Sequence, residues 1–270
     1  MKKVLIVMLM MAGIVGSCFG DWITDFNKAK DLLNEKDYAK AEKAYAKLLT
    51  DYPSATEIEK LQSKSGVATC IYKQDKFSDA YSYSLKATSE HQATDEPTST
   101  VLMRLKQTAA MAVMRQLDLD GAIQLFRAGL AEYPLAMDKV KAGMQVFVGN
   151  CYLQKKNYAE AVVELNKAIA NYPDVQSAVN WANILLSRAH MGQRDFNKAS
   201  EASVAYIVGA IKEKGSTNKL IIETYKRINP KTMTADGYKT AMEDILKATP
   251  AIEANAEFLG KVKSELDKMK

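Results

Sequence analysis

Histidine and cysteine, the residues that most often supply acid-base, nucleophilic or metal chemistry, are scarce in this chain of 270 residues. It contains two histidines. His91 lies in the segment SEHQATDEP, where Glu90, Asp95 and Glu96 could complete a metal site, although a polar linker between helices has the same composition. His190 falls on the apolar face of a helical pattern and is interpreted as a packing histidine. We therefore expect no metal ion.

Sequence motifs of the common enzyme classes are also missing. Neither the HExxH nor the GxSxG pattern occurs, and EKGSTNKL lacks the glycines and lysine with which a phosphate-binding loop holds its ligand. We expect no catalytic residue, no cofactor and no enzymatic activity. The 37 basic and 32 acidic residues alternate along the chain instead of forming a basic stripe, which excludes nucleic acid as an expected partner.

Three cysteines remain to be explained. Cys70 and Cys151 occupy equivalent helices two repeats apart in the pattern described below, farther than the roughly 4.4 to 6.8 Å between Cα atoms that a disulfide requires. We expect both to be buried free thiols. Cys18 belongs to the N-terminal segment and has a different explanation.

The first 20 residues, MKKVLIVMLMMAGIVGSCFG, have the pattern of a signal peptide. Two lysines precede an apolar run from Val4 to Val15, which as a helix would span only ~18 Å of a ~30 Å hydrocarbon core. Two cleavage sites fit. The residues up to Cys18 resemble a lipobox, which would make Cys18 a lipidated N-terminus, whereas cleavage after Gly20 would release a soluble protein that begins at Asp21. Either site predicts export to the periplasm or to the periplasmic face of the outer membrane.

A seventeen-residue sequence pattern occurs three times: DYAKAEKAYAKLLTDYP at 37–53, DLDGAIQLFRAGLAEYP at 118–134 and NYAEAVVELNKAIANYP at 157–173. Weaker copies lie at 76–92 and 195–207. All five copies place an alanine three residues after an aromatic residue or leucine, and two packing positions follow at helical spacing. The alanines are Ala41, Ala80, Ala122, Ala161 and Ala199. The pattern predicts a helix whose apolar face is buried.

A second small residue stands twelve positions before each of these alanines, across a short polar turn. These residues are Ala29, Ala68, Ala110, Gly149 and Ser187. A fixed separation between two small residues predicts a pair of antiparallel helices that touch where neither has bulk.

The small residue, the aromatic and alanine, and the closing Pro53, Pro134 and Pro173 together resemble the tetratricopeptide repeat. The resemblance implies an all-α, right-handed α-solenoid of antiparallel helix pairs, with about five units over 21–210. The segment 211–250 is interpreted as a divergent sixth helix pair and 251–270 as a C-terminal capping helix.

Proteins with such repeats hold peptide segments on a concave wall made mainly by the first helices. The positions one and four residues after the small residue should face that wall. Over the five units they are Lys30 and Leu33, Thr69 and Tyr72, Met111 and Met114, Asn150 and Leu153, and Arg188 and Met191. We expect the partner-binding residues to be Lys30, Tyr72, Met111, Met114, Asn150, Arg188 and Met191.

The sequence thus favours a non-enzymatic scaffold of the bacterial cell envelope that binds a protein partner. The leader and the DYP, EYP and NYP closures are similar to those of the repeat lipoprotein of outer-membrane β-barrel assembly and of the repeat protein that works with the Tol-Pal system. A module that binds peptidoglycan or another envelope glycan is the alternative. It would need aromatic rings exposed for sugar stacking, for which Tyr72 and Trp181 are the candidates.

Overall fold

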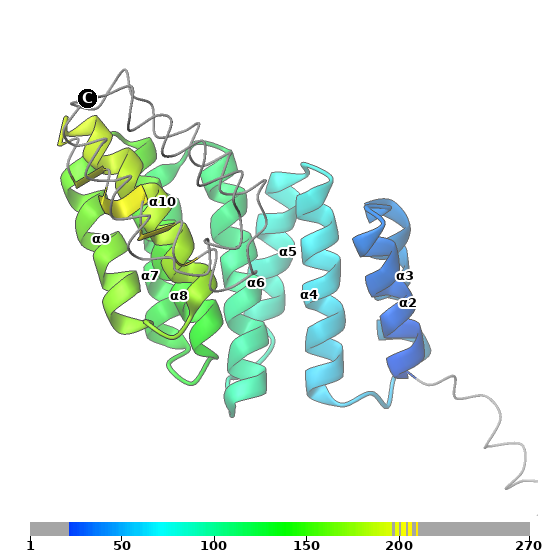
Figure 1. Ribbon diagram of the computed structural model, residues 1–270. Coiled ribbons are helices and arrows are strands. Elements are labelled where there is room, and N and C mark those ends of the chain that lie inside the picture. The colour runs from blue at the N-terminus through cyan, green and yellow to red at the C-terminus, as the bar shows by residue number, and fades with distance from the viewer. Residues whose placement is uncertain (1–21, 196–197, 200, 204, 207–208, 210–270) are drawn as a thin grey trace, which may run out of the picture. The chain divides into compact units, whose positions relative to one another are not determined.

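The computed structural model describes residues 22–195, 198–199, 201–203, 205–206 and 209. Within these residues every regular element is helical (Figure 1). The helices are α2 (Trp22–Asn34), α3 (Tyr38–Asp51), α4 (Glu57–Lys73), α5 (Phe77–Ser89), α6 (Glu96–Arg115), α7 (Leu119–Glu132), α8 (Asp138–Gln154), α9 (Tyr158–Asn171) and α10 (Gln176–Gly192). None of these described helices combines the length and apolarity needed to cross a membrane.

The small residues predicted at the helix contacts are buried. Ala29, Ala41, Ala68, Ala80, Ala110, Ala122 and Ala161 have no exposed surface, and Ala199 is 4% exposed. At Gly149 an added Cβ would lie 2.6 Å from the Cγ atom of Leu165, so only glycine allows α8 to approach α9 this closely. In the fifth unit, Ser187 and Ser203 meet through a hydrogen bond of 2.7 Å. This burial agrees with the predicted close approach of the two helices, and α2 contacts α3, α4 contacts α5 and α8 contacts α9.

The turn inside each helix pair has one backbone conformation. A residue five positions before the key alanine adopts a positive φ of 59° to 68°; these residues are Lys36, Asp75, Leu117, Lys156 and Arg194. In four of the turns the next residue donates its backbone N–H to the carbonyl group five residues earlier, as Asp37 does to Leu32. This pattern closes the first helix with a left-handed residue and satisfies its last carbonyl groups.

Side-chain caps fix where several helices begin. The Asp37 carboxylate accepts the N–H of Lys40 at the start of α3, and Asn157 does the same for Glu160 at the start of α9. Thr56 and Glu59 form a reciprocal capping box at the start of α4. These side chains satisfy N–H groups that have no partner within the helix.

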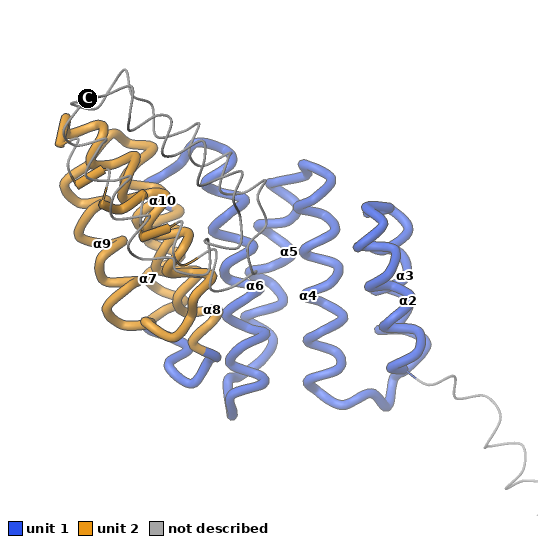
Figure 2. Tube along the Cα trace, viewed as in Figure 1, with its two compact units in different colours: residues 1–121, 131–137 blue, residues 122–130, 138–270 orange. Residues whose placement is uncertain are grey.

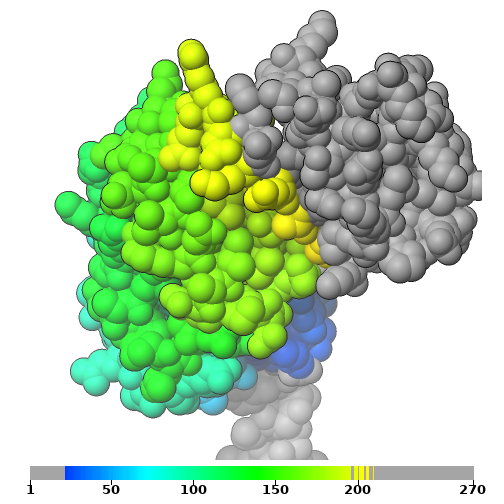
Figure 3. Space-filling model, turned by 60° about the vertical axis from the view of Figure 1, so that its left-hand side comes forward, coloured from blue at the N-terminus to red at the C-terminus, as the bar shows by residue number. Residues whose placement is uncertain are grey.

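The chain divides into two compact units, residues 1–121 with 131–137 and residues 122–130 with 138–270 (Figure 2). The core of unit 1 gathers Tyr45, Leu48, Val67, Cys70 and other side chains of α2 to α5. The core of unit 2 forms around Val146, Leu165, Ala182 and Leu185. The green and yellow residues of unit 2 make a closely packed surface on the face shown in Figure 3.

Three predicted segments lie outside the described residues: the signal peptide at 1–20 with Cys18, the divergent pair at 211–250 and the capping helix at 251–270. The repeats over 21–210 are described up to residue 195 and at scattered positions beyond it.

Candidate functional site

A pocket of about 330 Å³ opens in unit 1 on the face formed by its first helices. Helices α2, α4 and α6 supply most of its wall, and Tyr45 reaches it from α3. The lining residues are Phe26, Lys30, Leu33, Tyr45, Gln62, Ser65, Gly66, Thr69, Val101 and Arg104. This pocket is the candidate site.

The lining residues share one helical face. Lys30 and Thr69 each follow the small residue of their helix by one position, and Leu33 follows it by four, as the sequence predicts. Gln62 and Arg104 lie six positions before the small residue of α4 and α6, which is the same face nearer the helix start. The pocket in unit 1 therefore lies on the face that the sequence analysis proposed for binding, but it also includes residues from the first half of the helices, which that analysis did not consider.

Aromatic packing shapes the apolar side of the pocket. The Trp22 and Phe26 rings stack with their centroids 4.7 Å apart, and Phe26 meets the Tyr45 ring edge-on at 5.4 Å. At Gly66 an added Cβ would come within 2.6 Å of the Tyr45 ring, so glycine lets that ring lie directly against α4. Phe26, Leu33, Tyr45 and the buried Val101 give the pocket an apolar wall of fixed shape.

Two cations give the pocket its charge. Lys30 and Arg104 are both exposed, and within the described part of the chain neither side chain forms an ion pair or a hydrogen bond. No aspartate or glutamate is among the lining residues. The pocket is therefore positively charged as well as partly apolar.

The remaining residues predicted to bind a partner are placed differently. Tyr72 is half-buried and packs on Phe77, with ring centroids 5.6 Å apart. The Arg115 guanidinium lies 5.4 Å from the centroid of the Phe77 ring. Met111 and Met114 are half-buried on α6. None of the three lines the pocket described above.

In unit 2, Asn150 is half-buried on α8, and Arg188 and Met191 are exposed on α10. Their part in binding stays a prediction. Trp181 packs against Phe147 with centroids 4.6 Å apart. Tyr72 and Trp181 are both half-buried, and each packs against one other aromatic ring. The glycan alternative stays a prediction.

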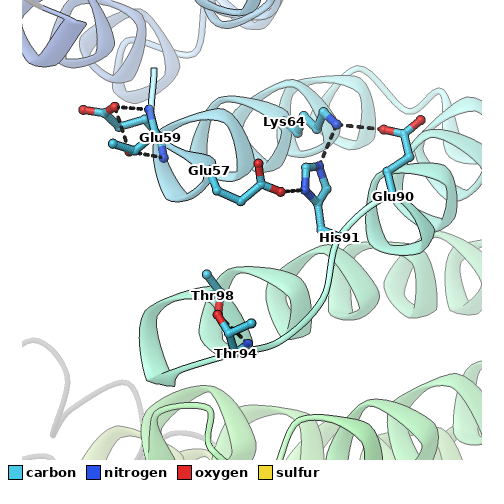
Figure 4. Close-up of polar contacts among 8 residues, drawn as sticks. Glu57, Glu59, Lys64, Glu90, His91, Thr94 and Thr98 are labelled. Atoms are coloured by element: carbon cyan, nitrogen blue, oxygen red, sulfur yellow. Dashed lines mark hydrogen bonds and ion pairs between the residues drawn. The ribbon is translucent and has the colours of Figure 1, made fainter. Parts of the chain in front are cut away.

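His91 lies in a cluster of polar side chains, but its partners are not the ones that the sequence suggested (Figure 4). Its Nδ1 atom contacts the Glu57 carboxylate, and its Nε2 atom lies 2.7 Å from the Nζ atom of Lys64. Lys64 also pairs with Glu90 at 2.7 Å. Because an ammonium group can only donate, Nε2 accepts from Lys64 and Nδ1 donates to Glu57. The cluster ties α4 to the segment that precedes α6.

Asp95, one of the three carboxylates considered as partners of His91 in a metal site, has another role. Asp95 caps α6 by accepting the N–H of Thr98 at 2.9 Å. No group of three or more potential metal ligands occurs among the described residues. Residues 90–95 of this segment connect α5 to α6.

The other chemical candidates are structural. His190 is buried to 9% exposure, with its Nδ1 atom 3.2 Å from the Gln193 side chain, as expected of a packing histidine. Cys70 and Cys151 are buried free thiols, as predicted. Burial raises the pKa of each thiol to about 12, so both stay protonated and unreactive at neutral pH.

Unit 2 contains a buried carboxylate that the sequence analysis missed. Glu164 of α9 is 3% exposed and accepts hydrogen bonds from Arg127 at 2.8 Å, Lys167 at 3.2 Å and Gln145 at 2.5 Å. Burial acts to raise the pKa of Glu164, but the hydrogen bonds from these three side chains outweigh it and hold the pKa below its ordinary value. Arg127 also lies over the Tyr152 ring at 5.7 Å. The network joins α7, α8 and α9 within the unit.

Comparisons with known proteins agree with the repeat pattern. Two tetratricopeptide repeat models match, one over residues 23–55 and one over residues 108–175. No curated protein sequence matches the chain.

Several solved structures are similar in fold. The apo form of RapI has a TM-score of 0.62 at 16% identity, with 93% of each chain covered. PilF of Pseudomonas aeruginosa has a TM-score of 0.57 at 14% identity, covering 89% of this chain and 97% of that one. The Rap conjugation gene regulator of plasmid pLS20, solved in complex with the Phr peptide, has a TM-score of 0.50 at 14% identity, covering 92% and 74%. The chain therefore carries tetratricopeptide repeats over the matched residues 23–55 and 108–175, and within the described residues the predicted all-α fold of antiparallel helix pairs is confirmed.

Proposed function

We propose that this protein is a non-enzymatic interaction module of the bacterial cell envelope that binds a segment of a protein partner in the pocket of unit 1. The observation that carries the proposal is the composition of that pocket. It combines an apolar wall with two cations that have no ion-pair partner in the described structure, on the face that the repeat pattern assigns to binding.

The repeat family supports the same function. Tetratricopeptide repeat proteins generally mediate protein–protein interaction, and one similar structure was solved with a peptide bound. Extended or helical segments suit such a wall because several helices contribute side chains along one direction.

We also propose that the protein acts in the periplasm or at the periplasmic face of the outer membrane, in outer-membrane assembly or beside the Tol-Pal system. The support is the signal-peptide pattern of residues 1–20. The mass of the mature N-terminus in the native host tests this part: a lipidated Cys18 would indicate membrane attachment, an N-terminal Asp21 a soluble protein, and an uncleaved Met1 would refute export.

Site-specific photocrosslinking tests the binding site. A photoreactive amino acid is placed at Thr69 in the pocket or at Lys43 on the exposed side of α3 as the matched control. In the native host we expect a discrete crosslinked protein from position 69 and none of that mass from position 43. Equal crosslinking from both positions, or the product from position 43 alone, would refute the pocket as the binding site.

A further inference from the structure

The charge of the unit 1 pocket indicates what kind of segment it takes. Lys30 of α2 and Arg104 of α6 line the pocket from different helices, and α4 contacts both of those helices between them (Figure 1). A cation that forms no ion pair with a carboxylate of the protein can attract an anionic ligand, and the attraction strengthens when the ligand excludes water. The two cations therefore favour a ligand that carries carboxylates and disfavour a basic one.

A row of uncharged polar groups runs along α4 between the cations. Gln62, Ser65 and Thr69 are spaced by three and four residues and so share one side of the helix. The Thr69 hydroxyl donates to the Ser65 carbonyl group at 2.8 Å, which leaves its oxygen able to accept. The Gln62 amide and the Ser65 hydroxyl have no hydrogen-bond partner in the described part of the chain. Such a row can donate to and accept from the backbone of a bound segment.

The apolar residues of the pocket set a further requirement for the ligand. Phe26, Leu33 and Val101 line the same pocket, and the rigid Tyr45 ring closes its inner side. Burial raises the pKa of the Tyr45 hydroxyl to about 12, so this group stays a neutral donor. A ligand that fills the pocket must bring an apolar side chain close to its carboxylate.

We infer that the pocket binds an internal, extended segment of a partner protein in which an aspartate or glutamate side chain stands beside an apolar residue. The carboxylate would lie between Lys30 and Arg104, the backbone along Gln62 and Ser65, and the apolar side chain against Phe26 and Val101. An internal segment is favoured over a chain end because the cations lie on two helices on either side of α4, so a chain that crosses the pocket can reach both. This inference rests on the proposed function.

The test is a peptide array probed with the purified full-length protein. Each N-acetylated, C-terminally amidated dodecapeptide carries acidic and apolar residues in varied order, and each has a partner in which glutamine and asparagine replace the acids. Amidation removes the terminal carboxylate, so any acid dependence comes from internal side chains. A third set keeps the free C-terminal carboxylate on the neutral peptides.

Variants that remove a positive charge inside or outside the pocket show which cations cause the preference for acidic peptides. We expect the acidic peptides to bind at least about tenfold more tightly than their neutral partners and to lose about threefold with either Lys30→Gln or Arg104→Gln and about tenfold with both. Lys43→Gln on α3 and Arg115→Gln at the end of α6 remove the same charge from outside the pocket and should leave affinity unchanged. Circular dichroism confirms that all five variants, the double variant included, are folded.

The outcomes separate this inference from the proposed function. Equal binding of acidic and neutral peptides would overturn the inference and leave the pocket as a binding site. Selective binding of the free-carboxylate set would replace the internal segment with a chain end and likewise overturn it. If no set binds to the folded protein, both the inference and peptide binding in the pocket are wrong.

Discussion

Two cations of unit 2, Arg127 and Lys167, pair with a buried carboxylate within the protein, whereas two cations of unit 1, Lys30 and Arg104, line a pocket. In unit 2 the buried Glu164 carboxylate has three hydrogen-bond donors, among them Arg127 and Lys167. In unit 1, Lys30 and Arg104 have no such partner among the described residues. A cation that pairs with a buried carboxylate stabilises the fold, while a cation on a pocket wall is available to a ligand. The same repeat can therefore serve either purpose, depending on which residues occupy its exposed faces.

The largest expected effect comes from removing the two cations of unit 2. Arg127→Met with Lys167→Met leaves Glu164 buried with Gln145 alone, which should lower the free energy of unfolding by about 3 kcal/mol. Lys30→Met with Arg104→Met should change it by less than about 0.5 kcal/mol, because those side chains are exposed and form no ion pair or hydrogen bond with the described residues. Urea denaturation of both double variants measures the difference. An equal loss of unfolding free energy in both double variants would contradict the proposed difference between the units.

Adding Glu164→Leu to the first double variant is the control for that result. It removes the unpaired buried charge, so most of the lost stability should return. A triple variant as unstable as the double variant would mean that packing, not charge, causes the loss.

The same network should impose a pH dependence on unit 2. Because the folded state lowers the pKa of Glu164, its contribution to stability is present above the ordinary carboxyl pKa of about 4.3 and is lost as the pH falls through the lower, folded-state pKa. The stability difference between the wild type and the Arg127→Met, Lys167→Met variant should therefore be largest at neutral pH and shrink on acidification. Urea titrations between pH 7 and about pH 3 measure it, and a difference that stays constant would contradict the assignment.

A smaller effect concerns uncharged polar groups in the interior of unit 1. Within the described residues, the buried side-chain atoms that lack a hydrogen-bond partner are Trp22 Nε1, Ser84 Oγ and Ser99 Oγ, all in unit 1. Ser84→Ala and Ser99→Ala each remove an unsatisfied hydroxyl group and should raise the free energy of unfolding by about 1 kcal/mol.

Ser63→Ala is the matched control, since the equally buried Ser63 hydroxyl donates to the Glu59 carbonyl group at 2.9 Å. It should bring no gain in the urea midpoint. A loss of stability in the Ser84 and Ser99 variants would show that these hydroxyl groups do have partners.

The smallest effect should be the same in both units, because both use the same turn. Lys36 in unit 1 and Lys156 in unit 2 adopt φ values of 65° and 59°, a region that disfavours side chains with a Cβ atom. Lys36→Gly and Lys156→Gly should each stabilise the protein by about 0.5 kcal/mol. Lys43→Gly in the interior of α3 should instead cost about 1 kcal/mol. If all three variants lower the thermal midpoint, the turn is not strained.

Most of the fold could be predicted because small residues recur at fixed positions in each repeat. A pair such as Ala29 and Ala41 fixes which helices touch and in which register, and this local relation does not depend on the rest of the chain. The left-handed turn residues could not be predicted in the same way, since lysine, aspartate, leucine and arginine occupy them where glycine is usual.

The candidate site could be predicted only in part. Lys30 and Thr69 follow from the helical period, but the neighbours that make a pocket depend on how three helices pack. Arg104 and Phe26 have no sequence signal beyond their place on the same helical face as Lys30 and Thr69. Extending that face to the first half of each helix would have included them. Tyr72 has the same helical spacing as Lys30 and Thr69, but its ring packs against the Phe77 ring. The partners of Glu164 lie on three helices and have no local pattern.

The central claim is that a partner segment binds in the unit 1 pocket, and cysteine protection tests it most directly. The described native cysteines, Cys70 and Cys151, are buried, so a maleimide should report on an introduced Thr69→Cys or on the control Lys43→Cys, each followed by peptide mapping. The labelling rate is measured for purified protein and for freshly broken cells of the native host. We expect position 69 to react at least about tenfold more slowly in the cell extract and position 43 to react equally in both. Equal rates at position 69 would contradict the claim.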